Sequence, residues 1–262
     1  MRRIVGAAAC AALFVACSTG PANVVEETAD NLGDIRSGEM SLDVLATTAT
    51  GSDRFGFTVE GPFSLPEDED SLPVLDLEYT QTVGDQELTS SFISTGDAMY
   101  IETDEGTFEL PDEQTETFRT GAASDDESIL SELELGDWLA DPELEEGDET
   151  ETVVAELDVV NALNDLFGLA RDLGAAVPEP LEGDSAEQVE NAVDSSSFEM
   201  VTGKDDRYLR LLSISIDLEA EAEQELQAIS DLLGVRFEME LTIERHNEQI
   251  SVEAPEGAEP LP

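Results

Sequence analysis

The residues able to do chemistry in this 262-residue chain are almost all carboxylates. Asp and Glu number 63, against 11 Lys and Arg, one histidine and two cysteines, for a formal net charge of −52. The sequence contains no G-x-S-x-G, H-E-x-x-H or C-x-x-C motif and no phosphate-binding glycine loop. The turn-like sequence around the single histidine, His246-Asn247-Glu248, is typical of a solvated surface residue rather than a general base. We therefore expect a protein that is not an enzyme, with a secreted enzyme as a weaker alternative.

The many carboxylates raise the possibility of a calcium site. Calcium loops of the D-x-[DN]-x-[DN]-G-x5-E type need a turn glycine, and the dense acidic run Glu67-Asp68-Glu69-Asp70 has none. Carboxylate pairs for glycoside hydrolysis can be chosen almost anywhere among so many acids, so no pair is informative. We expect no metal or other cofactor, and a solvated acidic surface rather than a specific cation store.

The excess of negative charge limits the partners and the environment. Nucleic acids and anionic membrane surfaces would repel such a chain, so neither is expected as a partner. Charge of one sign also destabilises the folded state unless salt screens it. The composition thus indicates a salt-adapted extracytoplasmic protein, whose melting temperature should rise with added salt.

The first 17 residues have the layout of a bacterial export signal. Arg2 and Arg3 precede an apolar run, Ile4 to Val15, that is too short to cross a bilayer as a helix. The sequence Leu13-Phe14-Val15-Ala16-Cys17 resembles a lipobox, in which the cysteine is lipidated and becomes the first mature residue; Phe14 stands where Leu is usual. A plain secretory signal with an incidental cysteine is the alternative.

These features divide the chain into a signal peptide, residues 1–16, a lipidated tether, 17–22, and a single folded domain, 23–262. Cys10 would leave with the signal, so the mature domain would contain no disulfide. Acyl chains on Cys17 would anchor the protein to the outer face of the cell membrane without help from a basic patch. We expect a monomer.

The rest of the sequence predicts an antiparallel sheet covered on one face. From Arg54 to Leu110, apolar and polar residues alternate in short runs separated by turn signals such as Gly84-Asp85 and Gly96-Asp97. Further strands are predicted at 40–45, 152–157, 198–202, 212–218, 235–243 and 250–254. The acidic segment 143–150 is expected to be a loop and 255–262 a tail.

Helical periodicity predicts the cover of this sheet. The clearest amphipathic helix runs from Val159 to Leu173, with Asp158 as its N-cap and Gly174 as its stop. Other helices are predicted at 23–37, where Gly38 would end the helix, and at 112–119, 185–193 and 222–233. Trp138 is expected to be a core or lid anchor. One sheet with its helices on one face is an α+β fold.

The order of these parts resembles that of the LolA/LppX-like bacterial lipoproteins over nearly the whole mature chain. The similar motifs are structural turns rather than catalytic signatures: the lipobox at Cys17, Ile35-Arg36-Ser37-Gly38, Gly61-Pro62-Phe63, Ser94 to Ile101, Phe108 to Pro111, Asp137-Trp138-Leu139, Leu157-Asp158-Val159, Thr202 to Asp206 and Ile250 to Pro255. The resemblance implies a strongly curved antiparallel half-barrel wrapped around helices, with an apolar cavity that in relatives holds lipid acyl chains or lipid-modified proteins. This chain departs from that pattern in its extreme acidity and in the helical insert at 222–233, which is able to plug such a cavity.

Two functions follow for the membrane-anchored lipoprotein. In the first it binds or carries a lipid or other apolar ligand, and the residues expected to line the cavity are Phe57, Tyr79, Phe92, Leu163, Phe167, Ile214 and Phe237. In the second it is a non-enzymatic structural or interaction lipoprotein. There the same residues form a filled core, which is the default for inward apolar side chains.

Overall fold

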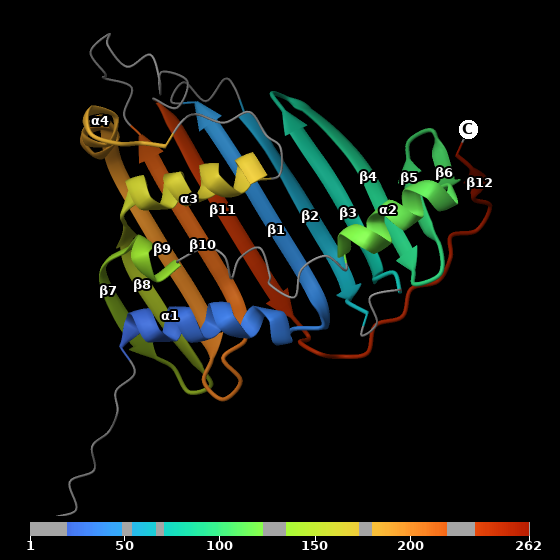
Figure 1. Ribbon diagram of the computed structural model, residues 1–262, viewed down its shortest axis with the longest axis horizontal. Coiled ribbons are helices and arrows are strands. Elements are labelled where there is room, and N and C mark those ends of the chain that lie inside the picture. Colours follow the sequence, from blue (N-terminus) through green and yellow to red (C-terminus); the bar gives the residue numbers. More distant parts are fainter. Residues whose placement is uncertain are drawn as a thin grey trace, which may run out of the picture.

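A computed structural model describes residues 20–48, 54–66, 71–122, 135–172, 180–218 and 234–261. These residues form an open twelve-stranded sheet with helices against one face (Figure 1). The strands lie in the order β12-β6-β5-β4-β3-β2-β1-β11-β10-β9-β8-β7. Among the described strands, β12 pairs parallel with β6 and the other pairs are antiparallel. The predicted α+β class, with an antiparallel sheet that does not close into a barrel, is confirmed.

The strands comprise β1 Ser37–Thr48, β2 Arg54–Ser64, β3 Val74–Val83, β4 Gln86–Thr95, β5 Met99–Thr103, β6 Gly106–Glu109, β7 Leu139–Glu146, β8 Thr150–Leu157, β9 Val193–Gly203, β10 Leu209–Leu218, β11 Val235–Glu244 and β12 Glu259–Pro260. The α-helices are α1 Pro21–Asp30, α2 Asp112–Ala122, α3 Val159–Asp172 and α4 Asp184–Ala192, and the 3-10 turns are η1 Asn31–Asp34 and η2 Leu135–Trp138. In Figure 1, α1, α3 and α4 lie over the part of the sheet that ends in β7, and α2 lies over the part that ends in β6.

A main hydrophobic core lies between α1, α3, α4 and strands β7 to β11. Alternate residues of the strands supply its sheet side, because side chains two apart in a strand share a face. Its most deeply buried members include Val24, Val25, Trp138, Val153, Phe198, Met200, Leu212, Ile214 and Ile216. Each such side chain contributes about 1.5–3 kcal/mol when it leaves water, so this core holds the three helices to the sheet.

Polar contacts fix α3 on that core. The Asp158 carboxylate accepts a hydrogen bond from the backbone N–H of Asn161 at 3.1 Å, as expected of an N-cap. The indole Nε1 of Trp138 donates to Oδ2 of Asp165 on α3 at 2.7 Å, and Trp138 is only 1% exposed. Trp138 is therefore a core anchor, one of the two roles predicted for it.

A second, smaller core lies at the opposite edge of the sheet. Leu72, Met99 and Leu110 are buried there, and Ile101 and Leu261 pack against them. Leu261 comes from the C-terminal end of the chain, so this core joins segments far apart in the sequence.

Three local predictions are wrong at the two ends of the chain. The helix predicted over 23–37 ends at Asp30, because Asn31-Leu32-Gly33-Asp34 is rich in poor helix formers and turns as η1. Gly38 lies within β1, where an added Cβ would approach the Glu244 carbonyl oxygen to 2.7 Å. The strand predicted at 250–254 has no ladder partner. Two residues of the predicted tail form β12 instead.

The acidic segment 143–150, predicted as a loop, belongs partly to β7. Residues 143–146 pair with β8, which gives the edge strand a partner despite its charge. The register shifts between Ala140 and Glu143, where Asp141 adopts a left-handed φ of 48° beside Pro142. The predicted insert at 222–233 and the lipobox at Cys17 lie outside the described residues.

Candidate functional site

Rows of apolar side chains cross the helix side of the sheet from strand to strand. Residues directly opposed in an antiparallel ladder point to the same face. One row therefore runs through Ile214, Met239, Val44 and Phe57, and the next through Leu212, Leu241, Leu42, Val59 and Tyr79. Both rows begin in the main core and continue onto β2, and the second reaches β3 at Tyr79, so the face is continuous across these strands.

The seven predicted cavity residues fall into two groups, with Leu163 and Phe167 on α3 and the other five on the helix side of the sheet. Ile214 is 1% exposed in the main core, and Leu163, Phe167 and Phe237 are partly buried against that core. Phe57, Tyr79 and Phe92 lie on β2, β3 and β4, half-buried, and belong to neither hydrophobic core. The structure thus places four of the seven residues at the main core and three outside it.

The part of the face around these three residues is only partly covered. The rings of Phe57 and Tyr79 stack with centroids 6.2 Å apart. Near them, Phe55 is 56% exposed, its cross-strand partner Val83 49%, and Leu88 69%. We name this region the open apolar face; it consists of Val44, Phe55, Phe57, Val59, Tyr79, Val83, Leu88 and Phe92.

Sequence reasoning did not select the most exposed members of this face. Phe55 and Leu88 show the right alternation, which gives the side of the sheet on which they lie. Alternation carries no signal for where the helical cover stops, and that boundary decides which apolar residues remain exposed.

The polar side chains on the open apolar face carry no charge. Gln81 opposes both Phe57 and Leu88, Gln86 opposes Val83, and Ser90 opposes Tyr79. The carboxylates of these strands have the opposite parity, so Glu60, Glu78 and Glu87 point to the outer face. The sheet therefore separates an apolar and neutral face from an acidic one.

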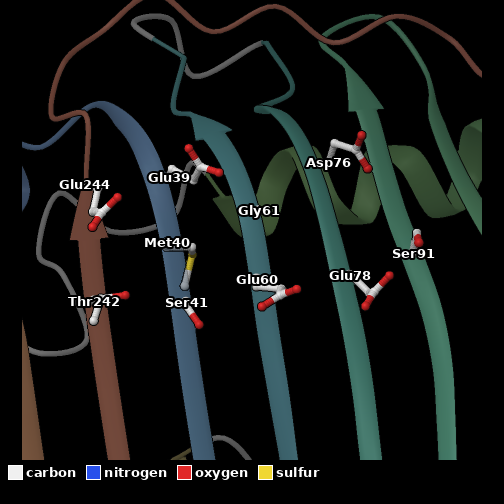
Figure 2. A pocket seen from close by; sticks show the side chains of 10 residues that line it. All are labelled: Glu39, Met40, Ser41, Glu60, Gly61, Asp76, Glu78, Ser91, Thr242 and Glu244. Atoms are coloured by element: carbon white, nitrogen blue, oxygen red, sulfur yellow. The ribbon is translucent and has the colours of Figure 1, made fainter.

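The outer face contains the hollow shown in Figure 2, with a volume of about 470 Å³. Its lining residues come from β11, β1, β2, β3 and β4: Glu39, Met40, Ser41, Glu60, Gly61, Asp76, Glu78, Ser91, Thr242 and Glu244. Glu39 opposes Glu244, and Glu60 opposes Glu78. Like charges in such positions repel each other. Within the described ranges, no cluster of three or more His, Cys, Asp or Glu side chains is arranged to hold a metal ion.

The polar surroundings of the single histidine differ from the solvated turn predicted for it. His246 is half-buried; its Nε2 lies 2.7 Å from the Leu209 carbonyl oxygen, and its Nδ1 lies 2.9 Å from Nη1 of Arg210. Since a carbonyl only accepts and a guanidinium only donates, Nε2 is placed to donate to Leu209 and Nδ1 to accept from Arg210. His246 serves as a structural link between strands β10 and β11, and not as a free surface side chain.

Comparison with known proteins shows a similarity in fold alone, and that similarity is low. No protein-family model and no curated protein matches the chain. Among solved structures it is similar to LprF from Mycobacterium bovis, with 11% identity and a TM-score of 0.37 over 90% of this chain and 97% of that one. The structure thus defines a fold class and no more: the chain is an α+β protein with an open antiparallel sheet and a half-covered apolar face. No helix among the described residues has the length and apolar character needed to span a membrane.

Proposed function

We propose that this chain is a membrane-anchored extracytoplasmic lipoprotein that binds a lipid or other apolar ligand on the open apolar face. The observation that carries the proposal is the exposure of Phe55, Val83 and Leu88 beside the stacked pair Phe57 and Tyr79. Contiguous exposed apolar surface is unfavourable in water and marks binding sites in soluble domains. Such sites are mostly apolar with a few polar groups, and Gln81, Gln86 and Ser90 supply those groups here.

The distribution of charge supports an uncharged, apolar ligand portion. Carboxylates on β2 to β4 point to the outer face, so a hydrocarbon chain on the helix side meets no charged group from the ladder rows that contain Phe57 and Tyr79. An anionic headgroup would be repelled by a chain of net charge −52. We therefore place the hydrocarbon on the face and any polar headgroup toward solvent.

The anchor belongs to the same proposal. The described chain begins at Gly20 and enters α1 at Pro21, four residues after Cys17. Four extended residues reach about 13 Å, so a lipid on Cys17 would hold α1 close to the membrane. α1 is itself fixed to the sheet, because Val24 and Val25 are fully buried and Glu27 pairs with Arg207 at 3.2 Å.

The alternative is a non-enzymatic structural or interaction lipoprotein with a filled core. The observation that favours it is the position of Ile214, Leu163, Phe167 and Phe237 at the main core. If those four residues pack solidly, the ligand space is limited to the open apolar face, and a protein partner would cover that face instead.

Ligand extraction tests the proposal against this alternative. The Cys17→Ser protein, exported by a salt-tolerant bacterial host, would be examined by native mass spectrometry and then by solvent extraction. We expect a stoichiometric apolar molecule and saturable uptake of a fluorescent fatty acid. A protein that carries nothing and takes up no fatty acid would contradict the proposal and favour the interaction lipoprotein.

A matched pair of variants locates the site. Leu88→Glu puts a charge on the open apolar face and should weaken fatty-acid uptake about tenfold, which corresponds to about 1.4 kcal/mol. Thr89→Glu adds the same charge one residue away on the outer face, where Thr89 opposes Thr80, and should leave uptake unchanged. Equal effects of both variants would show that the face is not the site.

A further inference from the structure

The C-terminal segment 245–261 connects distant parts of the sheet without joining the ladder for most of its length. It leaves β11 after Glu244 and ends beside β6, at the opposite side of strands β1 to β5. Figure 1 shows this segment running along one end of those strands. We name it the C-terminal strap. Its half-buried residues Ile250 and Val252 alternate with exposed ones, which explains why the sequence pattern predicted a strand there.

The strap is fixed firmly at its start. The Asn247 side chain accepts a hydrogen bond from the Arg36 N–H at 2.8 Å and donates to the Asp34 carbonyl and the Tyr208 hydroxyl. Its own backbone N–H donates to the Ser37 carbonyl at 2.8 Å, and the Ser37 hydroxyl donates to the Glu248 carbonyl at 2.6 Å. Asn247 has a left-handed φ of 58°, a conformation that Asn tolerates better than most residues.

An ion pair and the histidine reinforce this first anchor. Arg245 donates to Glu248 at 2.9 Å and lies 3.4 Å from Glu39 on β1, and these two carboxylates raise the pKa of its guanidinium. His246 bonds to the Leu209 carbonyl and to Arg210 on β10. The start of the strap is thus tied to β1, to β10 and to the segment that precedes β1.

The strap is fixed again at its far end. Glu259 and Pro260 pair with Phe108 and Glu109 as β12, and the Leu261 N–H donates to the Glu109 carbonyl at 3.0 Å. The Leu261 side chain packs into the second core against Leu72, Met99 and Leu110. Between Glu248 and Glu259 the chain makes no strand pairing.

The strap has only limited spare length between these anchors. Six strand spacings of about 4.8 Å separate β1, to which Asn247 is bonded, from β12, or about 29 Å along the sheet. Twelve residue steps lead from Asn247 to Glu259, which reach at most about 40 Å when fully extended. The turn at Glu256-Gly257, with Gly257 at a φ of 79°, shortens that reach.

We propose that the C-terminal strap is a tie that sets the curvature of the sheet, by fixing how far the second core stands from β11. The strands between its two anchors include β2, β3 and β4, so the tie also sets the width of the open apolar face. This role follows from the anchors and the length of the strap. It does not depend on which ligand, if any, occupies the face.

Distance measurement between two spin labels tests the tie. The labels are placed at Thr107→Cys on β6 and Ser215→Cys on β10, in the full chain carrying Cys10→Ser and Cys17→Ser. Thr107 opposes Glu102 and Ser215 opposes Glu238, so both labels lie on the outer face, away from the cores. Eight Gly and Ser residues are then inserted after Ala254, and the same eight residues are appended after Pro262 in the control.

The insertion should lengthen the mean label distance by about one strand spacing, roughly 5 Å, or more, and broaden its distribution. The appended control should leave the distribution unchanged, because it adds residues outside the two anchors. A second variant, Leu261→Asp, removes the far anchor with a single substitution and should produce the same shift as the insertion. A distance distribution that stays unchanged in the insertion variant would overturn the proposal. If the insertion prevents folding, an unchanged distribution in Leu261→Asp would overturn it instead.

Discussion

The covered and the open regions of this sheet carry the same apolar rows in different surroundings. In the row that contains Ile214 and Phe57, Ile214 lies beneath the helices and is 1% exposed. Phe57, at the other end of the row, is half-buried and belongs to neither hydrophobic core. The alternating sequence is alike in both regions. The position of the helices therefore decides whether an apolar residue acts as core or remains available for binding.

This difference is informative because apolar side chains outside a core bring little stability. Burial stabilises a fold roughly in proportion to the apolar area removed from water. Residues such as Phe55 and Leu88 therefore contribute less to folding than residues of the same type in the main core. Their exposure on β2 and β4 is what the proposed binding role would require.

The largest expected effect compares two phenylalanines across the boundary. Phe198→Ala on β9, where the side chain is 1% exposed in the main core, should lower the free energy of unfolding by about 3–5 kcal/mol. Phe57→Ala should cost clearly less, because the ring is only half-buried. Urea unfolding at constant salt measures both, with Ser197→Ala as the control on the outer face of β9. Equal losses for the two phenylalanines would remove the distinction between the regions.

An intermediate effect tests how the helical cover is attached. Asp165→Ala leaves the buried Trp138 Nε1 donor without its carboxylate and should cost about 1–3 kcal/mol. In a Trp138→Phe background the donor is absent, so the same substitution should cost much less. A double-mutant cycle by urea unfolding gives the coupling, and additive losses would show that this hydrogen bond does not secure α3.

The smallest effect concerns the acidic outer face behind the open region. Glu60 and Glu78 oppose each other directly, so Glu60→Gln should raise the stability at low salt by about 0.2–1 kcal/mol. The gain should shrink as salt screens the repulsion. Thermal melting at low and high salt measures it, with Glu105→Gln in an exposed turn as the control. A gain that is independent of salt would mean that repulsion between the pair is not its source.

Periodicity was sufficient to predict much of the fold. Alternation placed Phe57, Tyr79 and Ile214 on one face, and the 3.6-residue pattern with its Asp158 cap predicted α3. These features are encoded within a few neighbouring residues, so a single sequence carries them. The α+β class follows from their order.

What could not be predicted depends on contacts between distant segments. The alternation of Ile250 and Val252 predicted a strand, yet no ladder forms there. Likewise, nothing near His246 in the sequence indicates its bonds to Leu209 and Arg210. The boundary of the open apolar face also depends on where α1, α3 and α4 pack, which no local pattern encodes.

The two edges of the sheet have a consequence for behaviour at high concentration. An exposed, regular edge strand is a template onto which further chains can add and build fibres. At one edge, β12 pairs with only two residues of β6 and itself contains Pro260, which has no N–H to donate to a further strand. At the other, β7 is interrupted by the left-handed Asp141 and Pro142 and is lined with glutamates. The sheet thus resists end-to-end polymerisation, and crowded solutions of the protein should remain free of amyloid-like assemblies.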